Sequence, residues 1–107
     1  MSFNIEITSN FKKELKRLLK KYPSLKNEFK ILIENLELNP FMGKQLGNKC
    51  YKIRVSIKSK GKGKSGGARI ITHIIVEEKN IYLLSIYDKS NQENITDKKI
   101  LQLINDL

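Results

Sequence analysis

The residues that can do chemistry in this 107-residue chain are lysines, arginines and tyrosines. The more usual catalytic groups are scarce, because the chain has one histidine, His73, and one cysteine, Cys50. His73 stands in the middle of an apolar segment, which favours a structural role. One cysteine and one histidine cannot build a disulfide or a His/Cys zinc centre within the chain. We therefore expect no metal and no cofactor.

Basic residues are concentrated in one stretch. The chain has 21 Lys and Arg against 11 Asp and Glu, a net charge of +10. No acidic residue occurs from Leu38 through Val76. The cations of that stretch are Lys44, Lys49, Lys52, Arg54, Lys58, Lys60, Lys62, Lys64 and Arg69. Because a solvated surface normally mixes both signs, this excess indicates a polyanionic partner: nucleic acid, the ribosome, an acidic protein or an anionic membrane.

Clustered cations suit one reaction in particular, the cleavage of RNA by its own 2′-hydroxyl. The nucleophile lies within the substrate, so the protein has to orient it and remove its proton. It must also stabilise the phosphorane and protonate the leaving 5′-oxygen. Cations supply the electrostatic stabilisation, and crowding them lowers a lysine pKa so that one lysine can accept a proton near neutral pH.

The glycine-lysine segment at residues 59–67 is a second candidate for phosphate contacts. Its Gly63-Lys64-Ser65 resembles the end of a nucleotide-binding loop. That motif needs a glycine where Lys58 stands, and a helix after the serine where the pattern predicts a strand. We interpret the segment as a flexible basic loop that contacts a phosphate chain without reading its sequence.

The first half of the chain predicts a strand and two helices. Apolar and polar residues alternate over residues 3–8, as in a strand with one buried face. Helical apolar spacing follows over residues 11–22 and 25–36. Thr8, Ser9 and Asn10 are the candidate N-caps of the first helix, and Ser24 is that of the second. The break at Pro23 is so short that we expect an antiparallel helical hairpin.

The second half predicts three strands and a helix. Residues 51–58 alternate between apolar and basic side chains, which indicates a strand with one basic face. The nearly continuous apolar runs at 68–76 and 81–87 predict central strands that are covered on both faces. Thr96 is the candidate N-cap of a last helix that extends to residue 107.

These elements predict a single α+β domain over residues 1–107. The order is β-α-α-β-β-β-α, with a small antiparallel sheet covered by the N-terminal hairpin and the C-terminal helix. No apolar run approaches the roughly 18 residues of a membrane span, and the first residues have no signal-peptide pattern. We therefore expect a cytoplasmic protein with no membrane contact.

Three segments resemble the RelE/ParE toxin superfamily, and most closely its RelE/HigB branch. They are residues 51–54, 59–69 and 83–90; residues 11–16 and 39–47 fit the same pattern. The resemblance covers essentially the whole chain and agrees with the predicted order of elements. It implies the toxin of a type II toxin–antitoxin pair, with a cognate antitoxin as partner.

Two activities follow from this resemblance, and the charge alone allows a third. RelE-like toxins cleave mRNA in the ribosomal A site, which implies the ribosome and mRNA as partners, without a metal. ParE-like toxins inhibit DNA gyrase and are not enzymes. A basic nucleic-acid-binding module without toxicity needs only the charge. The retained basic strand and loop favour the endoribonuclease.

The resemblance also assigns site residues one at a time. Arg69 matches the arginine that contacts the scissile phosphate, and Lys89 falls where RelE-like toxins have a second basic residue. The tyrosine of RelE is not matched, because its aligned position is about Ile95, and Tyr87 is the nearest substitute. We expect Arg69, Lys89 and Tyr87 to be catalytic. The expected RNA-binding residues are Lys52, Arg54, Lys58, Lys60, Lys62 and Lys64, of which Lys52 and Arg54 can instead meet an acidic antitoxin segment.

Overall fold

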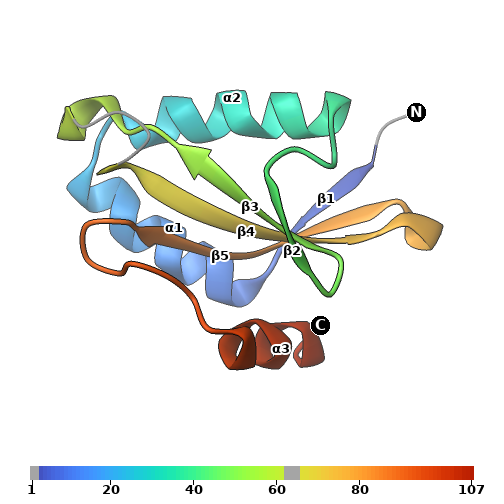
Figure 1. Cartoon of the computed structure of the whole chain (residues 1–107). Helices are drawn as coiled ribbons and strands as arrows, with labels where there is room; N and C mark the ends of the chain where they lie inside the picture. The colour runs from blue at the N-terminus through green and yellow to red at the C-terminus, as the bar shows by residue number, and fades with distance from the viewer. Residues whose placement is uncertain (1–2, 62–65) are drawn as a thin grey trace.

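The computed structural model describes residues 3–61 and 66–107, and it confirms the predicted α+β class (Figure 1). The strands are β1 (Asn4–Ile7), β2 (Lys44–Gly47), β3 (Cys50–Val55), β4 (Ala68–Ile75) and β5 (Asn80–Asp88). The helices are α1 (Ser9–Lys21), α2 (Leu25–Leu38) and α3 (Asp97–Asn105), with 3₁₀ turns at Lys58–Lys60 and Val76–Glu78. None of the helices in this part of the chain is long and apolar enough to cross a membrane.

The strands form one sheet in the order β1-β5-β4-β3-β2. The predicted antiparallel meander of β3, β4 and β5 is confirmed. The sheet as a whole is mixed rather than antiparallel, because β1 pairs with β5 in parallel. The two helices that follow β1 carry the chain across the sheet to its other edge, so the last strand, and not the next one, becomes the neighbour of β1.

The short strand β2 lies in a segment whose sequence predicted a loop. It pairs with β3 through a two-residue turn, in which Asn48 and Lys49 have φ angles of 52° and 61°. Two positive φ angles are typical of the hairpin turn that matches strand twist. The sequence signal is weak, because a lysine rarely occupies the second of these positions.

The helices cover opposite faces of the sheet, with α2 above it and α3 below it in Figure 1. On one face, Phe11 and Leu25 of the helical pair pack against Ile70 and Ile86. On the other, Ile100 of α3 belongs to a second buried cluster, with Ile71, Leu84, Tyr87 and Leu103. β4 is the middle strand and is buried over seven of its eight residues, so the prediction of central strands covered on both faces is confirmed.

Side chains of α1 complete the edge of β5 beyond the end of β1. Asn10 Nδ2 donates to the Leu84 carbonyl at 2.9 Å. The Glu14 carboxylate accepts from the Ile86 N–H at 3.3 Å and from Ser85 Oγ at 2.8 Å. Backbone groups at an open edge need such partners, so α1 fixes the position of the part of β5 that precedes Tyr87.

The first and the last helix are capped by predicted residues, and Thr8 is the cap among the three candidates of the first helix. Thr8 accepts from the Phe11 N–H at 3.2 Å, and Thr96 accepts from the Lys99 N–H at 3.1 Å. Ser24 precedes α2, but its hydroxyl does not cap the helix. It accepts instead from the Ser59 N–H at 3.0 Å. This bond fastens the start of the basic loop to the junction of the two helices.

Candidate active site

Three of the predicted residues lie in one row across the sheet. Arg54 of β3 is the cross-strand partner of Arg69 on β4, and Arg69 is the partner of Tyr87 on β5. Tyr87 packs in the cluster that α3 covers, so the row belongs to that face of the sheet. Strand alternation places Lys52 on the same face, two residues before Arg54. Strand register thus joins residues that are far apart in the sequence.

Lys52 is at the centre of a cationic cluster. Its pKa is lowered from the usual lysine value, first by partial burial and then by the positive charges of its neighbours, which are Lys44, Arg69, Lys89 and Arg54. An ammonium that is desolvated and surrounded by like charge loses its proton more easily. We call these five residues, Lys44, Lys52, Arg54, Arg69 and Lys89, the cationic cluster.

Lys44 is a member that the sequence analysis did not single out. It is the cross-strand partner of Lys52 on β2, the strand that the sequence did not predict. The only signal in the sequence was its place in the acid-free stretch, which it shares with residues outside the cluster. Its role therefore depends on the β2–β3 register.

Arg69 takes part in the cluster from a buried position. It is only 4% exposed, and its Nη1 donates to the Ala68 carbonyl at 3.2 Å. Arg54 is exposed, and Lys52 and Lys89 are half-buried. A phosphate that approaches this face therefore meets Lys52, Arg54 and Lys89 first, with the Arg69 charge behind them.

Lys89 is positioned by the end of the basic loop. Its backbone N–H donates to the Gly67 carbonyl at 3.0 Å, and its Nζ donates to the Glu93 carbonyl at 2.8 Å. The chain passes β3 so closely at Gly67 that a Cβ there would lie 2.0 Å from the Val55 carbonyl oxygen. Only glycine fits at this position. Because Lys89 is hydrogen-bonded to Gly67, this close passage fixes the position of Lys89 after the end of β5.

The Tyr87 side chain is less accessible to a substrate than its place in the row suggests. It is 4% exposed, and its hydroxyl is buried with no hydrogen-bond partner in the described part of the chain. Burial raises the pKa of the phenol, and the charge of Arg69 offsets only part of that rise. The hydroxyl does not reach the surface in this arrangement, so proton transfer to RNA by Tyr87 gains no support.

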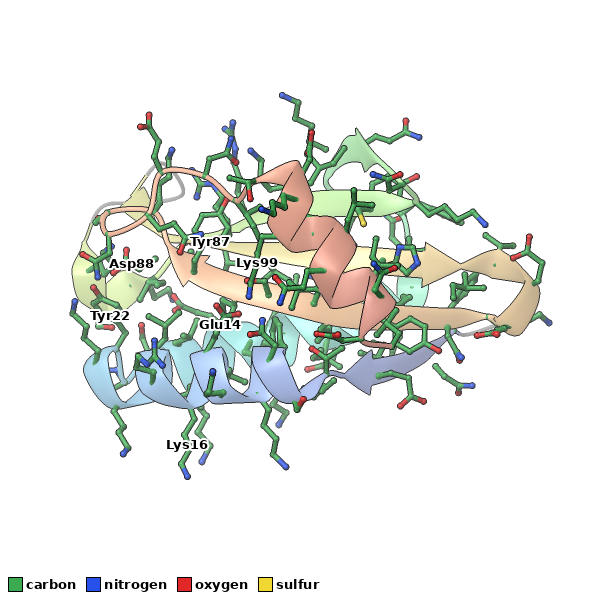
Figure 2. The ribbon with its side chains drawn as sticks, turned by 90° about the horizontal axis from the view of Figure 1, so that it is seen from below. Glu14, Lys16, Tyr22, Tyr87, Asp88 and Lys99 are labelled. Atoms are coloured by element: carbon green, nitrogen blue, oxygen red, sulfur yellow. The ribbon has the colours of Figure 1, made fainter. Side chains whose placement is uncertain are left out.

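Lys60 lies apart from the cationic cluster. Its ammonium binds the Asp88 carboxylate and donates to Ser90 Oγ at 2.8 Å. It also lies 5.2 Å from the centre of the Tyr22 ring, whose hydroxyl donates to Asp88 at 2.6 Å. Figure 2 shows Tyr22 and Asp88 at the same end of the molecule. We call Tyr22, Lys60 and Asp88 the loop anchor.

Three further basic residues are predicted to bind RNA, and the structure describes one of them, Lys58. The Lys58 side chain is exposed, and its backbone N–H donates to Glu28 at 2.7 Å. Lys62 and Lys64 lie outside the described residues.

His73 and Cys50 form a buried pair outside the site. Cys50 Sγ lies 3.5 Å from His73 Nδ1. Burial raises the pKa of the Cys50 thiol to about 11 and lowers the pKa of His73. A neutral thiol beside a neutral imidazole is a structural pair. Among the residues that the structure describes, no group of three or more His, Cys, Asp and Glu could hold a metal ion.

Comparison with known proteins places this arrangement in a family. The model of the family described as the RelE toxin of the RelE / RelB toxin-antitoxin system matches residues 7–105. One similar solved structure is a double arginine-to-alanine variant of the E. coli toxin RelE in the free state. It is 15% identical, with a TM-score of 0.63, and the match covers 100% of this chain and 99% of that chain.

Two further structures share the fold at low identity. The intact E. coli RelBE toxin–antitoxin complex matches with 18% identity and a TM-score of 0.60, over 81% of this chain and 96% of that chain. A metal-bound toxin from Helicobacter pylori matches with 21% identity and a TM-score of 0.51, over 83% and 97%. At these low identities, the structural similarities show a shared fold and nothing more. Since the family model spans residues 7–105 of the 107, the chain belongs to the RelE toxin family.

Proposed function

We propose that this protein is a ribosome-dependent endoribonuclease that cleaves translated mRNA without a metal ion. The observation that carries the proposal is the cationic cluster itself, in which strand register sets Lys44 beside Lys52 and Arg54 beside Arg69; these charges and partial burial lower the pKa of Lys52. A lysine that gives up its proton more easily, beside two arginines and a further lysine, supplies a base and a charged cradle at one place.

The cluster accounts for each step of the reaction. Lys52, in its deprotonated form, takes the proton from the 2′-hydroxyl, whose oxygen attacks the phosphorus. The bond from phosphorus to the 5′-oxygen breaks, and Lys89 gives its proton to that oxygen. The products are a 2′,3′-cyclic phosphate and a 5′-hydroxyl. Arg54 stabilises the charge on the phosphorane directly, for which the planar guanidinium with its paired donors is suited, and the buried charge of Arg69 adds to this stabilisation from behind.

These roles differ from those that the resemblance alone assigned. Lys52 changes from an RNA contact to the proton acceptor, because its surroundings lower its pKa. Tyr87 has no role in proton transfer, because its hydroxyl is buried. Lys58 remains an RNA contact with an exposed side chain, whereas Lys60 serves the loop anchor. The RNA contacts of Lys62 and Lys64 stay predictions.

The proposal includes a cognate antitoxin that neutralises this face in the cytoplasm. The net charge of +10 attracts an acidic segment strongly. The likeness to a chain of the intact E. coli RelBE toxin–antitoxin complex supports such a partner. We expect amide-exchange protection on β3, on β4 and around Lys89 in the complex. Protection confined to α3 would contradict this placement.

Single-turnover cleavage of mRNA on programmed ribosomes tests the chemistry. Lys52→Arg keeps the charge but cannot offer a neutral base, so we expect unchanged ribosome binding and a rate lower by about 10²–10⁴-fold. Arg54→Lys should lower the rate by about 10²–10³-fold, as for the loss of an oxyanion-hole donor. Lys26→Gln on α2, which is exposed and outside the cluster, is the control. Cleavage by Lys52→Arg within a few-fold of the parent rate would contradict the proposal.

Mapping of mRNA 5′ ends after expression in cells separates the other two activities. Cuts within translated codons support the endoribonuclease. DNA damage without such cuts assigns the protein to the gyrase inhibitors. If neither cuts nor DNA damage occur, the protein is a non-toxic nucleic-acid-binding module.

A further inference from the structure

Helix α1 carries two adjacent rows of cations on its outer face. One row is Lys12, Lys16 and Lys20, and the other is Lys13, Arg17 and Lys21; all six are exposed. Neighbours within a row are four residues apart, or about 6 Å along the helix axis. Figure 2 shows Lys16 pointing away from the body of the protein. We call these six residues the α1 basic face.

No acidic side chain in the described chain offsets this charge. Glu14 is the one acidic residue of α1, and its carboxylate points inward, to Asn10, Ser85 and the Ile86 N–H. No ion pair joins the α1 basic face to any acid among residues 3–61 and 66–107. Like charges four residues apart destabilise a helix. The helix thus carries a repulsion that an external anion would relieve.

The α1 basic face offers charge without apolar contact. The large apolar side chains that are exposed lie elsewhere in the described chain, on residues such as Ile31, Leu38, Phe41 and Leu101. A helix that binds a membrane surface buries an apolar face, and protein–protein interfaces are more than half apolar. A nucleic-acid backbone needs cations alone. The ligand that fits the α1 basic face is therefore the phosphate backbone of a nucleic acid.

One row of the α1 basic face, formed by Lys12, Lys16 and Lys20, is also separate from the cationic cluster. Arg17 of the other row lines a pocket with Tyr87 and Asp88, whereas none of these three lysines lines it. Figure 2 shows Lys16 pointing away from Tyr87. Phosphates on Lys12, Lys16 and Lys20 therefore do not compete with the scissile phosphate.

We propose that the α1 basic face binds the phosphate backbone of double-helical RNA and docks the toxin on ribosomal RNA. The choice of RNA over DNA rests on the proposed ribosome-dependent function. Because the contacts lie away from the reacting phosphate, they stabilise the bound substrate and the transition state equally. Such uniform binding changes KM and leaves kcat unaltered.

Binding of the whole protein to a fully paired RNA hairpin, measured over a range of salt concentrations, tests the surface without any cleavage. Each lost phosphate contact reduces the slope of log K against log salt by about 0.9. We expect the variant with Lys12, Lys16 and Lys20 changed to Gln to lose between two and three units of slope. The control variant has Gln at Lys26, Lys30 and Lys98, three exposed lysines of α2 and α3. It carries the same net charge and should lose less than one unit.

Equal losses in the two variants would show that net charge, and not the α1 basic face, determines binding, and would overturn the proposal. Tighter binding to a DNA duplex of the same sequence, or to polyglutamate, would overturn the assignment to RNA.

Cleavage on ribosomes provides the second measurement. We expect the α1 variant to raise KM about tenfold or more at unchanged kcat, in contrast to Lys52→Arg, which lowers kcat. A lowered kcat at unchanged KM in the α1 variant would contradict the docking role. If the parent protein does not cleave mRNA at all, the proposed function fails, and the hairpin result still decides whether the α1 basic face binds RNA.

Discussion

The Tyr22 hydroxyl donates a hydrogen bond of 2.6 Å to the Asp88 carboxylate across 66 residues of sequence. The bond joins the end of α1 to the end of β5, and the Lys60 ammonium binds the same carboxylate from the basic loop. Asp88 lies between Tyr87 and Lys89, so the loop anchor holds the backbone that carries two predicted site residues. A buried acid in a cationic protein therefore has a structural task here.

We expect Asp88→Asn to destabilise the protein by about 3–5 kcal/mol, because the nearly buried Lys60 ammonium is left without its countercharge. Tyr22→Phe, which removes one hydrogen bond to a charged group, should cost about 1.5–3 kcal/mol. Urea unfolding measures both. Combining Lys60→Met with Asp88→Asn should cost less than the sum of the two single changes, and strict additivity would show that the pair is not coupled.

The loop anchor also predicts loss of stability in acid. Burial alone raises the pKa of Asp88, but hydrogen bonds from Lys60, Tyr22 and the Ser90 N–H outweigh burial and hold the pKa below its usual value. A carboxyl whose pKa is lowered by folding stabilises the protein above its unfolded pKa of about 3.9 and ceases to do so as the pH falls through the folded pKa. The difference in unfolding free energy between the parent and Asp88→Asn should therefore shrink below about pH 4. A difference that stays constant down to pH 2 would contradict this linkage.

Lys44→Gln should move the pH dependence of cleavage toward higher pH. Lys44 is one of the cations that lower the pKa of Lys52, so its removal raises that pKa and leaves less of the neutral amine near pH 7. The rate should fall at neutral pH and recover at higher pH. Single-turnover rates across the pH range provide the measurement, with Lys30→Gln on α2 as the control of equal charge. A uniform loss of rate at every pH would mean that Lys44 acts by binding RNA instead.

Gly67→Ala should destabilise the protein by at least about 1–3 kcal/mol, because a Cβ would overlap the Val55 carbonyl oxygen at 2.0 Å. Cleavage should fall as well, since Lys89 is held by the Gly67 carbonyl. Gly61→Ala is the matched control. It has a φ of +71° with open space around it, so it carries only the left-handed backbone cost of about 1–2 kcal/mol. Equal thermal stabilities of the two variants would count against the close passage at Gly67.

The sequence by itself determined the helices and the strands other than β2, and it indicated the type of chemistry. Apolar spacing placed α1, α2 and α3, and the β-branched runs at β4 and β5 identified the buried strands, because periodicity is a local property of the chain. The absence of acids from Leu38 through Val76 located the cationic region for the same reason.

Only the tertiary structure decided which of those cations act together. Strand register sets Arg54 beside Arg69 and Lys44 beside Lys52, and no spacing in the sequence encodes pairing between strands. Burial then separates residues that look alike in sequence. Lys52 lies among cations, which lower its pKa, whereas Lys60, eight positions later, lies against Asp88 and Tyr22. The charge state of a side chain depends on what surrounds it in space, and folding brings those groups from β2, β5 and α1.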